Sequence, residues 1–192
     1  MKHFEIDPAL SVYTLVKNTQ EQRKFIHATR MMSMISREIE DTVILDGVRA
    51  RVFSSFQRMS SFLPQADRYR RLAENADSVY VFAYPDIQPP PIVNITYVPI
   101  PEDSQLAREW FIVADARDYY TALVTEELPG GPSRRFEGVW SFDEEMVDIL
   151  QAALSNLVRA RTLLFEQRDY GAQINLMGST INRLAGRISG SG

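Results

Sequence analysis

Cysteine is absent from this 192-residue chain, and histidine occurs only at His3 and His27. Without cysteine the chain can form no disulfide, thiolate nucleophile, cysteine-bound zinc site or thioether-linked chromophore. Two isolated histidines also argue against a histidine-centred metal site. We therefore expect no metal site, and the composition identifies no cofactor.

Motifs that signal nucleotide or protease chemistry are missing too. The chain contains no Gly-x-x-x-x-Gly-Lys, no Gly-x-Gly-x-x-Gly and no His-Glu-x-x-His. Its Gly130-Gly131 pair lies between two prolines and is typical of a turn. Since no set of reacting groups stands out, we predict no catalytic residues and a protein that is not an enzyme.

Long apolar runs and an excess of positive charge are likewise absent. No stretch reaches the roughly 18 apolar residues of a membrane helix, and the segment 1–7 lacks the apolar core of a signal peptide. We expect a cytoplasmic protein without a membrane span. The formal net charge of −4 argues against nucleic-acid binding, which needs cations to neutralise phosphates.

The sequence does contain alternating helix and strand patterns. A short helix is expected near 10–18, and a longer one over 21–45 that packs by one side, with Glu38, Glu40 and Asp41 on its other faces. Strands are predicted at 49–57, 79–84, 92–100 and 110–114, a helix at 65–76, and a strand or short helix at 119–126. Because short turns link most strands, we predict an α+β fold with a mainly antiparallel central sheet. The N-terminal helices would pack on one face, followed by a long C-terminal heptad helix.

The stretch Arg134–Glu145 joins a strand to that C-terminal helix. Aromatic residues alternate with other residues up to Phe142, which indicates a strand with one face on a core. Ser141 and Glu144 have the Ser-x-x-Glu spacing of a capping box, so a helix is predicted to begin at about Phe142.

Two apolar seams follow in the predicted helix, out of step by one residue. Gly171 is the expected position of the register shift, because glycine loosens a helix interior. The seams supply the candidate dimerisation residues, which are Val147, Leu150, Leu154, Leu157, Leu164, Ile174, Met177, Ile181 and Leu184. A terminal helix that covers its own domain is the alternative for the first seam. We divide the chain into a globular domain, 1–145, and a helical segment, 146–192.

A small-molecule pocket needs aromatic walls and a few polar groups, and guanidinium groups match anionic ligands. The candidate ligand-binding residues are Phe53, Phe56, Gln57, Arg68, Tyr97, Trp110, Arg134, Arg135 and Trp140. The aromatic members could equally fill a dry core, and the arginines could pair with Glu109 or Glu137.

Several blocks together resemble a known family. They are Val52–Gln57, Arg68-Tyr69 with Leu72-Ala73, Val79–Phe82, Tyr97–Ile100, Arg108–Asp115 and Arg134–Asp143. This set resembles the DICT sensory domain of bacteria, over roughly Leu10 to Leu157. The combination of Glu-Trp before a strand and Arg-Arg-Phe-Glu-x-x-Trp-Ser is more specific than any single block.

The resemblance implies a bacterial signal-input domain. DICT domains are attached to diguanylate cyclase, phosphodiesterase and histidine-kinase modules and occur in some DNA-binding regulators. The implied partners are therefore a signalling kinase, a cyclic-dinucleotide enzyme or a regulator, together with a second copy of this chain. The chain shows no kinase phospho-acceptor segment, cyclase signature or helix-turn-helix. A structural interaction module without a ligand is the second hypothesis, and an enzyme the third.

Overall fold

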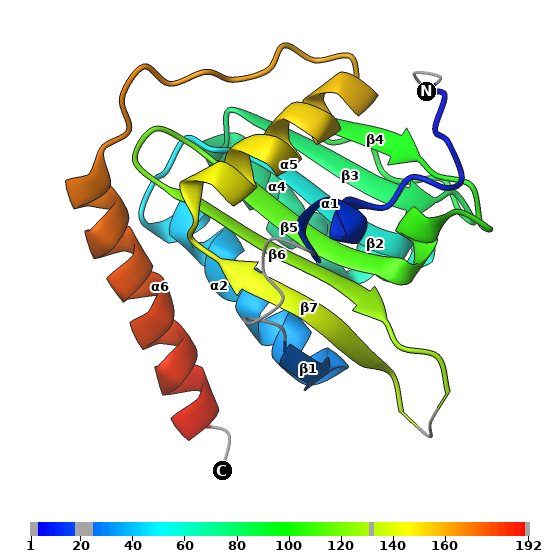
Figure 1. Cartoon of the computed structure of the whole chain (residues 1–192), viewed down its shortest axis with the longest axis horizontal. Helices are drawn as coiled ribbons and strands as arrows, with labels where there is room; N and C mark the ends of the chain where they lie inside the picture. Colours follow the sequence, from blue (N-terminus) through cyan, green and yellow to red (C-terminus); the bar gives the residue numbers. More distant parts are fainter. Residues whose placement is uncertain (1–3, 18–24, 131–132, 191–192) are drawn as a thin grey trace.

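A seven-stranded sheet forms the centre of the computed structural model, which describes residues 4–17, 25–130 and 133–190 (Figure 1). In chain order the strands are β1 Phe25–Ala28, β2 Arg51–Arg58, β3 Ser78–Tyr84, β4 Ile95–Pro99, β5 Glu109–Asp115, β6 Tyr120–Glu127 and β7 Arg135–Ser141. Their order across the sheet is β1-β7-β6-β5-β2-β3-β4. Four neighbouring pairs are antiparallel and the two involving β3 are parallel, which confirms the predicted α+β class.

Helices cover both faces of this sheet. They are α1 Val12–Lys17, α2 Thr29–Leu45, α3 Met59–Phe62, α4 Ala66–Asn75, α5 Glu144–Leu157 and α6 Tyr170–Ser189. In Figure 1, α1 and α5 cross the near face, whereas α2 and α4 lie behind the strands. The expectation of helices on one face is wrong, because the strands are apolar on both sides: Val52 and Phe53 are adjacent, equally buried and belong to opposite cores.

The two parallel pairs have different connections. Helices α3 and α4 carry the chain from β2 to β3, as parallel neighbours require a crossover. Between β3 and β4 the crossover is a loop that contains Pro89, Pro90 and Pro91, which cannot join a ladder. The helix predicted at 65–76 lies in the first of these links, and the sheet is antiparallel except at the two pairs of β3.

The second predicted helix begins later than expected. Residues 25–28 form β1, which pairs antiparallel with β7, and α2 starts only at Thr29. The expected start at Glu21 lies outside the described residues. Pairing at the edge of β7 outweighs the helical spacing of this segment, since propensity is a weak prior beside tertiary contact.

The predicted capping box is also wrong in detail. The helix after β7 begins at Glu144, and the side chain of Asp143 caps it by accepting a hydrogen bond from the Met146 amide at 2.9 Å. Ser141 is still part of β7, where it pairs with Ala122. Its hydroxyl accepts from the Asp143 amide at 3.1 Å, so it shapes the turn before the cap.

The C-terminal region contains two helices rather than one continuous helix. Helix α5 ends at Leu157, a non-helical linker spans 158–169, and α6 begins at Tyr170. Arg159 has a left-handed φ of +54°, a conformation that ends a helix. The expected register shift at Gly171 is therefore replaced by this linker, in which Leu164 is 87% exposed.

The first predicted dimerisation seam lies inside the chain's own core. Val147, Leu150 and Leu154 are buried against the sheet, and Leu157 packs partly on the same cluster. Val147, Leu150 and Leu154 therefore face the sheet, as in the alternative of a helix that covers its own domain. Among the described residues, no helix combines the length and apolarity that a membrane span needs.

Candidate functional site

A cavity of about 210 Å³ lies between α2 and the sheet. Its lining residues are Ser33, Ser36, Arg37 and Glu40 from α2, Ser54, Ser55, Phe56 and Gln57 from β2, Trp110, Phe111 and Ile112 from β5, and Ser61, Gln65, Tyr69 and Arg134. Helix α2 therefore forms one wall and the two central strands the other. We call this cavity the α2 pocket.

An irregularity in β2 shapes one end of the α2 pocket. The pairing of β2 with β3 shifts between Ser55 and Arg58, and Gln57 has a left-handed φ of +53°. Such a backbone costs a non-glycine residue about 1–2 kcal/mol, so the surrounding contacts must hold it. Gln57 donates to Glu127 Oε2 at 3.2 Å and accepts from Arg134, which also pairs with Glu127 at 2.7 Å. These three side chains connect the end of β2 to the end of β6 and the start of β7, which are distant in the sequence.

The aromatic wall is held in place by contacts within the chain. Trp110 Nε1 donates to Ser36 Oγ at 3.0 Å, which fixes the indole against α2. The same indole makes an edge-to-face contact with Phe136, with ring centres 5.6 Å apart. Phe56 is held in the same way by Phe62 and Tyr69, each at 5.2 Å.

The inner wall contains a buried carboxylate, Glu40. It forms an ion pair with Arg68, and its Oε1 lies 3.1 Å from the Tyr69 hydroxyl. That hydroxyl lies 2.7 Å from Ser54 Oγ. Burial raises the pKa of Glu40, although the Arg68 guanidinium opposes the shift. Burial also raises the pKa of Tyr69 well above its usual value, so the phenol keeps its proton.

Four of the nine predicted ligand residues line the α2 pocket, and the other five do not. Phe56, Gln57, Trp110 and Arg134 are brought together there. Arg68 stands behind the wall as the partner of Glu40.

The remaining four candidates lie elsewhere. Phe53 stacks on Tyr80 in the core under α5, and Trp140 donates to Thr121 Oγ1 on β6. Tyr97 donates to the Pro90 carbonyl, and Arg135 is exposed at the start of β7. The acidic partners suggested for the arginines were also wrong for Arg134 and Arg68, which pair with Glu127 and with Glu40 and Asp41.

Sequence reasoning missed the acidic side of the site. Glu38, Glu40 and Asp41 were expected on the outer faces of α2, yet each is at most 5% exposed. Helix α2 is covered by α4 on one flank and by α6 on another, which buries the faces that carry these acids, whereas Arg37 stays exposed. Three acids within four residues of a helix with an apolar face were the available signal, since acids are almost never buried unless paired.

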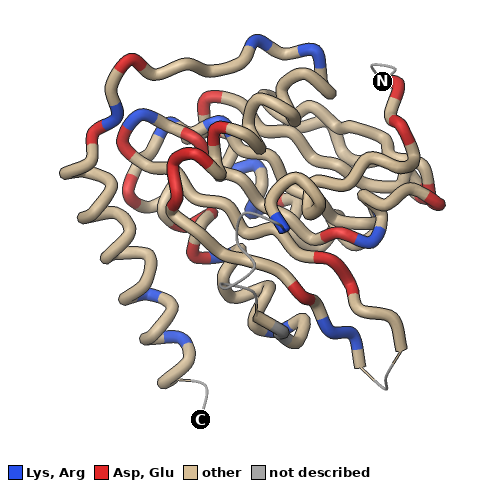
Figure 2. The backbone as a smooth tube through the Cα atoms, viewed as in Figure 1, with Lys and Arg blue, Asp and Glu red and all other residues tan. Residues whose placement is uncertain are grey.

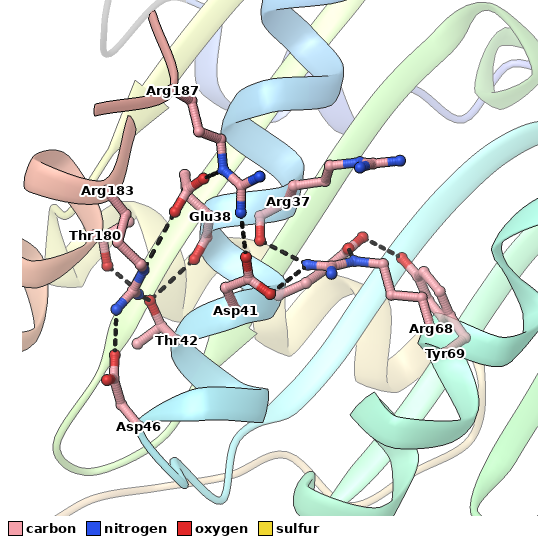
Figure 3. Close-up of polar contacts among 11 residues, drawn as sticks. Arg37, Glu38, Asp41, Thr42, Asp46, Arg68, Tyr69, Thr180, Arg183 and Arg187 are labelled. Carbon is pink, nitrogen blue, oxygen red and sulfur yellow. Dashed lines mark hydrogen bonds and ion pairs between the residues drawn. The ribbon is translucent and has the colours of Figure 1, made fainter. Parts of the chain in front are cut away.

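These acids connect the pocket wall to the C-terminal helix (Figure 3). Asp41 uses its two oxygens for different arginines: Oδ1 lies 2.9 Å from Arg68 Nη2, and Oδ2 lies 2.6 Å from Arg187 Nη2. Arg187 also pairs with Glu38 on α2. One carboxylate thus joins the partner of Glu40 to α6.

Arg183 completes the attachment of α6 to α2. It contacts Glu38 Oε2 at 3.2 Å, Asp46 Oδ2 at 2.9 Å and Thr42 Oγ1 at 2.6 Å. Arg183 and Arg187 are the charged residues of α6, and Figure 2 shows blue but no red segments on that helix. Both are used to bind α2.

The family of the chain follows from its sequence match. The model of the DICT family, described as the sensory domain in diguanylate cyclases and two-component systems, matches residues 9–128. The chain belongs to the DICT family. The DICT match covers α1 to β6 and therefore every lining residue of the α2 pocket except Arg134. None of the curated proteins matches the chain.

Membership gives the class of function. DICT is a sensory domain that occurs with signalling outputs such as diguanylate cyclases and kinases, which supports a signal-input role for the chain. Helices α5 and α6 follow the matched region. The predicted family is confirmed.

Proposed function

We propose that this DICT chain is a cytoplasmic signal-input domain that binds a small ligand in the α2 pocket and reports its presence through α6. The observation that carries the proposal is the shared carboxylate of Asp41, bonded to Arg68, which stands behind the pocket wall as the partner of Glu40, and to Arg187 on α6. A ligand can shift α6 only if it binds more tightly to one arrangement of that helix than to another. A change in the pairing of Arg68 supplies such a difference.

The proposal changes the division of the chain. Helix α5 is buried with the sheet and belongs to the sensory body, whereas the transmitting segment is the linker 158–169 with α6. This segment would act on a separate signalling protein or an attached output domain, such as a kinase, a cyclic-dinucleotide enzyme or a regulator.

Hydrogen-deuterium exchange of α6 tests the coupling without knowledge of the ligand. Glu40→Gln weakens the ion pair between residue 40 and Arg68. Arg68 should then interact more strongly with Asp41 and compete with Arg187 for that carboxylate. We expect faster amide exchange over 170–189 in this variant, because α6 then loses part of its attachment. Glu74→Gln, an exposed change on α4, serves as the matched control.

Asp41→Asn removes the shared carboxylate, so it shows how much amide exchange over 170–189 rises when this link is lost entirely. If exchange in α6 rises in Asp41→Asn but stays at the wild-type rate in Glu40→Gln, the pocket wall and α6 are independent. That result would end the transmission hypothesis.

We also propose that α6 pairs with a second copy of the chain. Of the predicted dimerisation residues, Ile174 and Ile181 are 62% and 44% exposed, and Ile188 continues the seven-residue spacing at 49%. The charges of α6 are turned toward α2, so two outer faces can meet without repulsion between like charges. Leu184 packs instead on the chain's own core, and Met177 is only partly exposed.

Sedimentation equilibrium tests this pairing. Wild-type protein should give a dimer mass, and Ile181→Asp should shift it to a monomer because a charge would be buried in an apolar contact. Asn182→Asp adds the same charge at the neighbouring exposed position and should leave the dimer intact. A monomeric wild type, or equal effects of both changes, would contradict the proposal.

A further inference from the structure

We infer that the α2 pocket takes a small organic anion, with its carboxylate or phosphate group at Arg37 and Arg134 and its flat apolar body against Phe56 and Trp110. The inference rests on the proposed function, in that it assumes the pocket is the ligand site. The argument comes from four features of the pocket: its charges, its free donors, its aromatic wall and its size.

The charges of the lining residues favour an anion. Two arginines and one glutamate line the pocket, and the glutamate is already matched by Arg68. Arg134 shares its guanidinium between Glu127 and Gln57. The Arg37 guanidinium has no hydrogen bond or ion pair within the described part of the chain. Figure 3 shows a dashed line only to its backbone oxygen, which accepts from Arg68 at 2.8 Å.

A cationic ligand fits this pocket poorly. It would need an acid whose oxygens are available, yet Glu40 has one oxygen on Arg68 and the other beside the Tyr69 hydroxyl. Burial also raises the pKa of Glu40, which further reduces its attraction for a cation.

The free hydrogen-bonding groups lie toward the solvent side. The buried hydroxyls of Ser36, Ser54 and Ser55 are used by Trp110, Tyr69 and the backbone of β5. By contrast, the Ser33 and Ser61 hydroxyls have no hydrogen-bond partner among the described residues, and both are at least partly exposed. Polar recognition is therefore left to the outer half of the pocket, where Arg37 and Arg134 are also exposed.

Beside its polar groups the pocket offers an aromatic surface. Phe56 and Trp110 are partly exposed, and their ring orientations are set by Tyr69 and by Ser36. A flat ring can lie against them without the cost of ordering flexible side chains. An anion with such a ring would thus place its charge outward and its ring inward.

The volume limits the size of the ligand. A space of about 210 Å³ equals roughly seven water molecules of liquid volume, which suits a single ring with a short acidic side chain. A ligand of about ten non-hydrogen atoms can bind in the millimolar range or tighter at ordinary ligand efficiency.

Three probes of matched shape test the charge preference. They are 4-hydroxyphenylacetate, its neutral amide 4-hydroxyphenylacetamide, and the cation tyramine, each titrated into the whole chain by calorimetry and ligand-observed NMR. We expect the carboxylate to bind about tenfold more tightly than the amide, with tyramine weaker still, since charge-assisted hydrogen bonds are about twice as strong as neutral ones. Phenyl phosphate is a fourth probe, and its affinity shows whether the pocket prefers a phosphate or a carboxylate group.

Variants locate the bound anion. Arg37→Gln should weaken binding of 4-hydroxyphenylacetate about tenfold and leave binding of the amide unchanged. Arg71→Gln, which changes an exposed arginine on α4 outside the pocket, is the matched control and should have no effect. Arg134→Gln provides a second change at the pocket if Arg37→Gln proves unstable.

Three results would overturn the inference. They are equal or tighter binding of the amide or of tyramine, no binding of any probe at about 10 mM, and anion binding that neither pocket variant weakens. Failure of the transmission hypothesis has a different signature: the anion binds through Arg37, and amide exchange in α6 does not change. The two proposals can therefore fail separately.

Discussion

Thr180 of α6 lies 2.7 Å from Thr42 of α2, measured between their hydroxyl oxygens, and both side chains are fully buried. This pair marks the centre of a helix contact that depends on polar groups. Thr42 also reaches the Glu38 carbonyl, and Thr180 reaches the Leu176 carbonyl, so neither hydroxyl is left without a partner. The position of α6 is consequently specified by hydrogen bonds as well as by burial.

Thr180→Val tests how strongly this contact holds α6. Valine keeps the volume but removes a partner from Thr42 and from the Tyr119 hydroxyl, 3.3 Å away. We expect a loss of about 1–3 kcal/mol in the free energy of unfolding by urea, because a buried donor or acceptor is left unpaired. Ser189→Ala, at the exposed end of α6, should change stability little. A Thr180→Val variant as stable as the wild type would show that the hydroxyls contribute nothing net.

Glu109 predicts a pH dependence of stability. This buried carboxylate accepts from the Ser11 hydroxyl and from the Val12 amide, which tie α1 to β5. Burial raises the pKa of Glu109 from 4.5 to about 7 despite these bonds. A raised pKa in the folded state means that this contribution to stability is fully present below about pH 4.5 and is lost as the pH rises through about 7.

Unfolding by urea between about pH 4 and about pH 8 checks this dependence. Relative to Glu109→Gln, which cannot ionise, the wild type should lose up to about 3 kcal/mol across this range. Glu74→Gln, at an exposed position, should leave the pH profile unchanged. A wild type that gains stability relative to Glu109→Gln as the pH rises would mean that the helix-capping bonds outweigh burial.

Gly138 on β7 is predicted to tolerate no side chain. A Cβ at this position would lie 2.2 Å from the Val124 carbonyl oxygen and 2.6 Å from Thr125 Cα, both backbone atoms of β6. Gly138→Ala should therefore cost more than about 3 kcal/mol or prevent folding, since the ladder itself must move. Gly186→Ala is the opposite case, because nothing lies within 4 Å and alanine favours a helix by up to about 1 kcal/mol. Thermal unfolding of both variants should give opposite shifts, and equal shifts would contradict this account.

Arg168 is predicted to fasten the linker between α5 and α6. Its guanidinium bonds to Asp115 Oδ1 at 2.8 Å and lies over the Tyr120 and Phe165 rings, at 4.5 and 4.7 Å. Arg168→Met leaves Asp115 buried without its cation, so we expect a loss of about 3–5 kcal/mol. The double variant Arg168→Met with Asp115→Asn should recover part of that loss, because no lone charge remains.

The pKa of Asp115 gives a second measurement of the same contact. Burial raises it to about 6, and the Arg168 guanidinium limits the rise. NMR titration of Arg168→Met should show a higher value still. Two results together would contradict this role of Arg168: a double variant less stable than Arg168→Met alone, and an Asp115 pKa in Arg168→Met that equals the wild-type value. Other contacts would then hold the linker in place.

The sequence revealed the buried strands more readily than their partners. The apolar runs at 79–84 and 110–114 are β3 and β5, but nothing local shows that β3 lies parallel to both its neighbours. The four residues of β1 have helical spacing and become a strand because the edge of β7 is beside them. The partner strand β7 lies more than one hundred residues later in the sequence, so local propensity does not reveal that residues 25–28 form a strand.

The site could be predicted only in part, for similar reasons. Phe53 and Phe56 are three residues apart in a strand, so strand geometry alone could have excluded one of them from a shared wall. The clustering of the α2 acids was visible in the sequence, but their partners were not, because Arg68 follows Glu40 by 28 residues and Arg183 follows Glu38 by 145. Likewise, the heptad spacing of α5 is the same whether it covers a sheet or another helix, and only the tertiary structure distinguishes the two.

The two C-terminal helices differ in how much their attachment depends on ion pairs, and this gives them different responses to salt. The ion pairs of α6 involve arginine side chains that are 22% and 42% exposed, so dissolved ions can screen them. The contact of α5 is apolar, and sulfate or phosphate salts strengthen such burial. Rising ionic strength should thus loosen α6 while α5 stays in place. The salt concentration around the protein would then help to set the position of α6.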